Sequence, residues 1–315
     1  MLSIALVQGG FCMCINNELK KYRIKFFLQE FSRNAKYIGI FSVVLTFFFD
    51  SIVFSLLSLF AIFAIVEVVL DFSVHKAGIL QYVGIIINKI KHGNKTPSIS
   101  NYENEIEYSL PFKGKWIAIN GSYTKEHSHS WSIPTQRYAY DFVIIDEKGK
   151  TFENELNKNK NYYCYDKDIL APADGEVVEV YNKAEDSIIL KPGKFLSRSP
   201  HVAGNYIIIK HTENEYSTLA HLKKDSIRVN KGDKVLRGEV IAKCGNTGNS
   251  TEPHLHFQLQ GGRSFYNSIG LPIKFRDIMI ETPPMEYKKI DPRTTISKEE
   301  IIEGYITRGY IVYNN

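Results

Sequence analysis

Apolar residues run almost without interruption from residue 37 to residue 70, where Asp50 and Glu67 are the only charged residues. A helix that crosses a bilayer needs about 20 apolar residues, and residues 51–70 alone meet that length. The pattern therefore predicts a membrane anchor, either as one transmembrane helix or as a short helical hairpin that turns near Asp50. A buried core helix of a soluble domain is the alternative.

The segments on either side of this run are more polar. Residues 1–36 form a basic N-terminal segment, and residues 71–105 combine a stretch typical of an amphipathic helix with a polar Gly/Pro/Ser linker. The positive-inside rule places a basic N-terminus in the cytoplasm. One span would then put the rest of the chain outside, whereas a hairpin would return it to the cytoplasm.

The hydrophobic pattern changes to a period of two after the linker, which is typical of strands with one buried face. The strand-like runs are separated by turns such as "APADG", "KPG" and "GNTG". This pattern predicts an all-β antiparallel sandwich or barrel-like domain behind an α-helical anchor. The predicted strands comprise residues 175–182, 187–191, 205–211, 216–222 and 239–245.

The net charge and the spacing of the cysteines argue against a nucleic-acid-binding protein and against a zinc finger. The net charge is +5 and the isoelectric point is near 8.8, but no Lys/Arg block or RNA-binding motif accompanies it, so no nucleic-acid partner is expected. The four cysteines, Cys12, Cys14, Cys164 and Cys244, lack zinc-finger spacing. A Cys164–Cys244 disulfide is possible, and the spacing does not decide it.

Polar residues that interrupt the β pattern indicate metal chemistry. In "PHLHFQLQ", His254 and His256 point to the same face of a strand, because side chains two apart share a face. Asp141 stands in the mostly apolar run "RYAYDFVIID", and His221 ends "YSTLAHL". A buried carboxylate is costly unless it is paired or binds a metal, and a catalytic zinc takes three protein ligands of these types.

Several of these pieces, in this order and spacing, resemble the lysostaphin-like (LytM-type) zinc metallopeptidases that cut peptide cross-links in bacterial cell walls. The resemblance covers about residues 115–270 and rests on "YAYDF", "APADGEVVEV", "GNYIIIKH", "YSTLAHL" and "VNKGDKVLRGEVIAKCGNTGNSTEPHLHFQL". It implies a compact antiparallel β peptidase domain with a groove, at residues 106–275, followed by a C-terminal tail at 276–315.

The resemblance also implies roles for individual residues. Asp141 and His256 match two zinc ligands of the family. His254 and His221 match its two catalytic histidines, which assist the attacking water and stabilise the oxyanion.

One position departs from the family pattern. The first zinc ligand of the family is usually a histidine four residues before the aspartate, and here that residue is Arg137, which cannot ligate zinc. The chain resembles a variant with a "QRYAxD" strand and a histidine about a dozen residues before the aspartate. His129 fits that position, and His127 is the alternative ligand. Arg137 is expected to orient Asp141 or to bind a substrate carboxylate.

These features predict a Zn²⁺-dependent metalloendopeptidase that hydrolyses peptide cross-links of peptidoglycan during wall remodelling. The chain is expected in the membrane, with an extracytoplasmic peptidase domain. Two alternatives remain: a catalytically inactive module that binds the wall or regulates another hydrolase, and a membrane peptidase that acts on another peptide substrate.

Overall fold

The computed structural model describes residues 17–93 and 95–315. The chain divides into two compact units, Met1–His75 and Lys76–Asn315, and each is described by itself.

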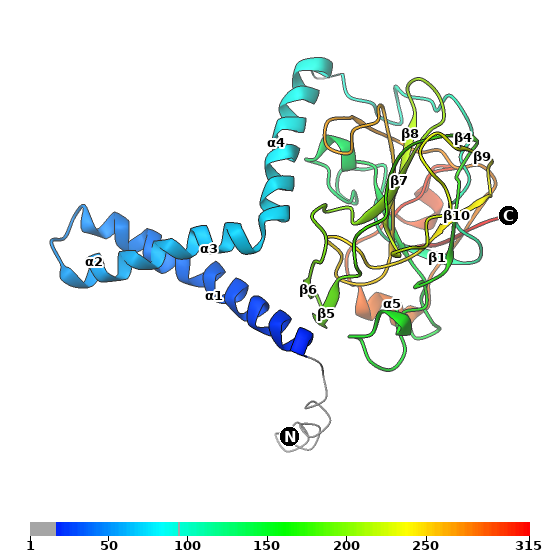
Figure 1. Cartoon of the computed structure of the whole chain (residues 1–315). Coiled ribbons are helices and arrows are strands. Elements are labelled where there is room, and N and C mark those ends of the chain that lie inside the picture. Colours follow the sequence, from blue (N-terminus) through cyan, green and yellow to red (C-terminus); the bar gives the residue numbers. More distant parts are fainter. Residues whose placement is uncertain (1–16, 94) are drawn as a thin grey trace. The chain divides into compact units, whose positions relative to one another are not determined.

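The first unit is a helical hairpin (Figure 1). Its first arm is α1 (Asn17–Thr46), and its second arm consists of α2 (Ile52–Ser58), the 3₁₀ turn η2 (Leu59–Ala61) and α3 (Ile62–Leu70). The arms cross closely at Gly39, where an added Cβ would lie 1.9 Å from the Ala61 backbone nitrogen. The apolar run therefore folds as a helical hairpin, with Asp50 in the turn.

Apart from Asp50 in the turn, the described charged residues of the hairpin lie towards its open end. Lys36 on α1 pairs with Glu67 on α3, and Gln29 donates a hydrogen bond to Asp71. The Arg33 guanidinium lies 3.9 Å from Glu67 and 3.6 Å from Asp71. The rest of the second arm is apolar and mostly exposed, and Ile52–Leu70 is long and apolar enough to cross a membrane, with a mean hydropathy of 2.7.

Helix α4 (Phe72–His92) occupies most of the segment expected to be an amphipathic helix. Its later turns contact the β domain at residues 266–268. Asn88 donates to the backbone carbonyls of Asn267 and Ser268 at 3.2 and 3.3 Å, and a Cβ on Gly84 would lie 2.0 Å from the Tyr266 carbonyl oxygen. This end of α4 is therefore an integral part of the second unit.

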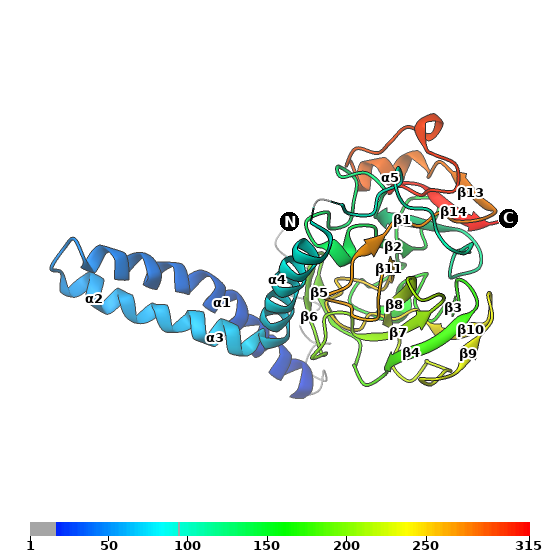
Figure 2. The same cartoon turned by 90° about the horizontal axis from the view of Figure 1, so that it is seen from above.

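A large antiparallel sheet forms the centre of the second unit (Figure 2). Its strands follow the order β13-β14-β1-β2-β11-β8-β7-β4-β9, and β12 pairs with β11. In chain order they are β1 (Trp116–Asn120), β2 (Tyr140–Val143), β4 (Gly175–Tyr181), β7 (Asn205–Lys210), β8 (Tyr216–Leu222), β9 (Lys234–Val235), β11 (Leu255–Gln260), β12 (Gly270–Leu271), β13 (Ile278–Glu281) and β14 (Ile311–Asn314).

Two smaller antiparallel pairs complete the β structure. They are β3 (Asp168–Leu170) with β10 (Val240–Lys243), and β5 (Ile188–Lys191) with β6 (Lys194–Leu196). The main hydrophobic core draws on both the large sheet and the β3–β10 pair, for example Phe257, Ile207 and Ile241. The predicted antiparallel β domain is confirmed, and each of the five predicted strands is present within one or two residues of its predicted ends.

The C-terminal residues extend this sheet. β14 pairs with β1, and β13 pairs with β14. Helix α5 (Met285–Ile290) and the 3₁₀ turn η5 (Lys298–Glu300) lie between β13 and β14 in the chain. Residues 276–315, which the sequence pattern separated as a tail, are thus part of the β domain.

Cys164 and Cys244 are both buried free thiols. The Cys164 thiol donates to the Pro253 carbonyl at 3.0 Å, so it helps to hold the chain just before His254. The cysteines at positions 12 and 14 lie outside the described residues.

Candidate metal and catalytic site

Strand pairing brings the first two polar residues of the site together. β11 lies between β2 and β8, and His256 is the direct cross-strand neighbour of Asp141 on one side and of Ala220 on the other. Opposed residues on neighbouring strands have their Cβ atoms about 5 Å apart. Successive side chains of β11 point to opposite faces of the sheet. Leu255 and Phe257 therefore point into the core, and His256 points toward Asp141.

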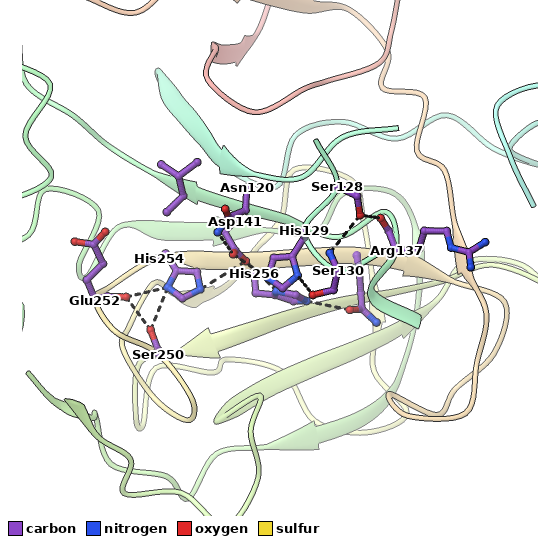
Figure 3. Close-up of polar contacts among 12 residues, drawn as sticks. Asn120, Ser128, His129, Ser130, Arg137, Asp141, Ser250, Glu252, His254 and His256 are labelled. Carbon is purple, nitrogen blue, oxygen red and sulfur yellow. Dashed lines mark hydrogen bonds and ion pairs between the residues drawn. The ribbon is translucent and has the colours of Figure 1, made fainter. Parts of the chain in front are cut away.

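The Asp141 carboxylate is the centre of the site (Figure 3). Its Oδ1 lies 2.9 Å from His256 Nδ1, and its Oδ2 lies 3.0 Å from His129 Nε2. Asn120 on β1 donates to Oδ2 at 2.9 Å. Only 4% of Asp141 is exposed, so these contacts compensate for the burial of its charge.

The loop before β2 presents His129 to this carboxylate. The Ser128 hydroxyl donates to the Arg137 carbonyl at 2.6 Å and accepts a bond from the Ser130 backbone nitrogen at 3.2 Å. The η3 turn (Pro134–Gln136) folds the intervening chain back on itself. His129 therefore reaches Asp141 although the two residues stand on different segments.

A chain of side-chain amides determines which nitrogen of His256 carries a proton. The Gly262 carbonyl can only accept, so Gln260 must donate to it through Nε2, at 2.7 Å. Gln260 Oε1 then accepts from Gln258 Nε2 at 2.6 Å. Gln258 Oε1 in turn accepts from His256 Nε2 at 2.9 Å, so Nε2 carries a hydrogen and Nδ1 is the nitrogen that faces Asp141.

This arrangement suits a cation. His256 Nδ1 and an oxygen of Asp141 lie 2.9 Å apart, so either a proton or a metal ion can bridge them. The ligand atoms of His129, Asp141 and His256 all lie within 4.8 Å of one another. Donors around a tetrahedral zinc are roughly 3.3 to 3.6 Å apart, so the three residues fit a metal with small movements.

The electrostatics of the cluster agree with this arrangement. Burial by itself would raise the pKa of Asp141, but the charges of His129 and His254 and the bonds from His129 and His256 hold it well below its usual value. Burial lowers the pKa of His129, but the Asp141 carboxylate outweighs this effect and raises it. The carboxylate is therefore ionised at neutral pH and available to a cation.

Two further imidazoles lie beside this cluster. The rings of His221 and His254 have centroids 4.5 Å apart, and the ring of His221 is 5.8 Å from that of His256. His254 Nε2 lies 3.6 Å from Asp141 Oδ1. The structure therefore brings together all five residues that the sequence assigned to catalysis or to its preferred metal site.

His221 is held in a strained backbone conformation. Its φ is +61°, a region that non-glycine residues rarely adopt and that is often found at functional sites. Its Nδ1 donates to the Thr247 carbonyl at 2.7 Å. The Thr247 loop packs tightly at Gly248, whose φ is +85° and whose missing Cβ leaves room for the Val202 carbonyl.

His127 and Arg137 lie outside the cluster. His127 Nδ1 contacts the Thr124 hydroxyl at 3.0 Å, and burial and the charge of Arg308 lower its pKa. The Arg137 guanidinium stacks 4.8 Å from the centre of the Trp131 ring and donates to the Trp131 carbonyl. In Figure 3 it points away from Asp141, and Asn120 instead makes the contact that orients the carboxylate.

Sequence reasoning missed Asn120 and its partner Arg293. Arg293, from the C-terminal segment, donates to Asn120 Oδ1 at 2.8 Å through Nη1. It is 173 residues away from Asn120 in the chain, and no local pattern marks either residue. The two residues meet only because the sheet places the C-terminal strands beside β1.

The geometry is that of a metal-dependent hydrolase: two histidines and a carboxylate surround one point, with two more imidazoles beside it. Residues 162–268 match the family model described as Peptidase family M23. The chain therefore contains an M23 peptidase domain. The matched residues include His221, His254 and His256, whereas His129 and Asp141 precede them.

Curated relatives match short parts of the chain. It is 45% identical over 64 residues to peptidoglycan DD-endopeptidase ShyA of Vibrio cholerae, which covers 20% of this chain and 14% of that protein. It is 39% identical over 80 residues to peptidoglycan DD-endopeptidase ShyB of the same organism, covering 25% and 17%. The chain thus spans less than a fifth of the length of these relatives.

Among solved structures, the catalytic domain of lysostaphin from Staphylococcus simulans is 21% identical, with coverage of 54% of this chain and 90% of that one and a TM-score of 0.28. A zinc-containing peptidase from Vibrio cholerae is 23% identical, with coverage of 53% and 39% and a TM-score of 0.31.

Proposed function

We propose that this protein is a zinc-dependent metalloendopeptidase that hydrolyses peptide cross-links of peptidoglycan. The observation that carries the proposal is the cluster of His129, Asp141 and His256, whose ligand atoms all lie within 4.8 Å of one another, because two imidazole nitrogens and a carboxylate oxygen form a donor set that zinc prefers. The M23 domain and the similarity to peptidoglycan DD-endopeptidases support the reaction and the substrate.

His129, Asp141 and His256 would hold the zinc, through Nε2, the carboxylate and Nδ1 respectively. Zinc supplies Lewis acidity that polarises a carbonyl group and lowers the pKa of water at the site. The Gln258 amide orients His256 through its Nε2–H, and such indirect contacts typically change metal affinity by about 10–100-fold.

His221 and His254 would move the proton. Each has Nδ1 opposite a backbone carbonyl, that of Thr247 for His221 and that of Glu252 for His254, at 2.7 and 2.8 Å. A carbonyl only accepts, so Nδ1 carries the hydrogen and Nε2 is the basic atom in the neutral ring. One Nε2 would take a proton from the attacking water, and the other imidazole, once protonated, would donate to the developing oxyanion.

Burial suits His221 to the role of base. Burial, together with the charges of His254 and His256, lowers the pKa of His221 well below its usual value. The ring is therefore neutral at physiological pH and ready to accept a proton.

We also propose that the helical hairpin is the membrane anchor. Its arms are apolar and exposed, and its charged residues gather at the open end. Both ends of a hairpin leave the bilayer on the same side, so residues 17–36 and the peptidase domain would lie on one side. The positive-inside rule would put that side in the cytoplasm because residues 17–36 are basic, whereas cleavage of the wall requires the opposite orientation, with both ends extracytoplasmic, and we propose the latter.

Hydrolysis of purified peptidoglycan by the full-length protein in detergent tests the function. Mass spectrometry of the products should show cross-linked muropeptides converted to monomers, with loss of activity on chelation and recovery with zinc. Zinc-replete protein that leaves cross-links intact, while still binding the wall, would support the inactive-module alternative instead.

The side of the membrane is tested separately. Reporters at the two ends of the chain should both report an extracytoplasmic location. A cytoplasmic location for both ends would favour a membrane peptidase with another peptide substrate.

A further inference from the structure

The C-terminal segment builds a cavity beside the catalytic cluster. It has a volume of about 300 Å³ and is lined by residues between 282 and 310, all beyond the part matched by the family model. This volume is at the small end of the range for ligand pockets. The cavity therefore accommodates a short group rather than a stretch of polymer.

The charges that line the cavity are mainly positive. Lys288, Arg293 and Arg308 contribute three cations, and Asp291 contributes one carboxylate. Asp291 is already engaged, because Arg293 contacts both of its oxygens at 2.7 Å. The cavity therefore has an excess of positive charge.

Arg308 lacks a charged partner. It donates to the Thr294 carbonyl from Nε at 3.3 Å and Nη2 at 2.9 Å, and no ion pair involves it among the described residues. Burial and the neighbouring charge of Arg293 lower its pKa. The nearby Asp291 carboxylate attracts Arg308 but is bonded to Arg293, so a partly buried cation whose own hydrogen bonds go only to a carbonyl gains stability from an added anion.

Backbone hydrogen bonds join two residues that line the cavity to β1 and the residue after it. The Arg308 backbone nitrogen donates to the Gly121 carbonyl at 2.8 Å, and that of Gly309 donates to Ala118 at 2.7 Å. On the same side, Arg293 contacts Asn120, which contacts Asp141. A group bound in the cavity would therefore have a defined position relative to the scissile bond.

We propose that this cavity binds a free carboxylate of the peptide substrate, with Arg308 and Lys288 as its partners. This inference rests on the proposed function for the identity of the substrate. A carboxylate matches the guanidinium fork of Arg308, and wall peptides carry carboxylates close to their cross-links. The bound carboxylate selects the substrate and places the peptide across the metal site.

The experiment compares two forms of one ligand. Purified disaccharide-peptide dimers are used as such and after carbodiimide amidation, which removes the negative charge with little change in shape. Dissociation constants are measured by calorimetry on the full-length protein with His254→Ala, which slows turnover by about 10²-fold or more, and KM and kcat are measured on the parent. The native dimer should bind at least about 10-fold more tightly than the amidated one, since a charge-assisted hydrogen bond contributes about 1.5–3 kcal/mol.

Variants assign this difference to the cavity. Arg308→Gln should raise the Kd and KM of the native dimer by about 10-fold or more, leave kcat nearly unchanged and have no effect on the amidated dimer. Lys288→Gln, at an exposed position, should show a smaller effect in the same direction even if Arg308→Gln destabilises the protein. Arg228→Gln is the control, because this exposed arginine lies outside the cavity.

The outcomes are distinguishable. Equal affinity for both dimers, or discrimination that survives both cavity substitutions, overturns the proposal. Binding of acetate or inorganic phosphate that depends on Arg308, with no preference for the native dimer, also overturns it in favour of a free-anion site. Cavity-dependent binding of the native dimer by a parent protein that cleaves neither form would refute the proposed function and uphold the carboxylate site.

Discussion

Replacement of His129 by alanine gives the sharpest test of the metal site, because His129 is the ligand that departs from the family pattern. The change removes the Nε2 atom that lies 3.0 Å from Asp141 Oδ2, and among the described residues no other histidine contacts that oxygen. His127→Ala is the matched control, since His127 stands two residues away in the same loop and contacts Thr124.

The magnitude follows from the number of ligands. Four-ligand structural zinc sites bind with about 10–16 kcal/mol, which corresponds to roughly 2.5–4 kcal/mol per ligand. Loss of one of the three protein ligands should therefore weaken zinc binding by about 10²–10³-fold. His127→Ala should change the affinity less than about threefold, because it removes no donor from the cluster.

Competition with a chromogenic chelator measures the zinc affinity, and peptidoglycan hydrolysis is measured on the same preparations. Thermal unfolding of the metal-free proteins shows whether the substitutions disturb the fold. If His129→Ala binds zinc like the parent and remains active, the assignment of this ligand is wrong. An equal loss in the two variants would indicate that the loop, rather than the His129 donor, matters.

Three further predictions concern other contacts. His254→Ala should retain zinc and lose about 10²-fold or more in kcat, the usual contribution of proton transfer; parent-like turnover would remove it from the mechanism. Gln258→Leu should weaken zinc binding by about 10–100-fold while the apo-protein stays folded, and an unchanged affinity would refute the role of the amide chain. Burial lowers the pKa of His211 to about 4, below the usual value near 6.5. The unfolded chain therefore binds a proton at His211 more readily than the folded protein does. The stability that comes from neutral His211 is complete above pH 6.5 and decreases as the pH falls towards 4. Between pH 7 and 4.5, the stability that denaturant unfolding measures should fall by about 2–3 kcal/mol less in His211→Gln than in the parent; the same slope in both proteins would contradict this account.

Local patterns were sufficient to predict the strands and the relation between His254 and His256. The period of two placed Leu255, Phe257 and Leu259 in the core, where all three are fully buried. Gln258 and Gln260 on the opposite face are also completely buried, although a period of two normally marks only one buried face. Their burial depends on the helix and loops that cover the sheet, which no strand period encodes.

The pattern was less reliable where the chain leaves the sheet. A strand from 137 to 146 would place Arg137 on the same face as Asp141, but β2 begins only at Tyr140 because the η3 turn precedes it. The contact from Asn120 and its support by Arg293 depend on the pairing of β14 with β1. Such contacts between segments far apart in the chain arise from tertiary structure and leave no trace in a local window.

The ion pairs at the open end of the hairpin set a limit on its immersion depth. Glu67 and its partners mark one boundary, and the turn before Ile52 marks the other. The roughly 15 residues between them span about 22 Å, whereas the hydrocarbon core of a bilayer is about 30 Å thick. A hairpin anchored at its charged end would therefore stop about 8 Å short of the opposite interface, which corresponds to a marked hydrophobic mismatch. We expect the anchor to thin the surrounding lipid and to partition into vesicles with short acyl chains in preference to long ones.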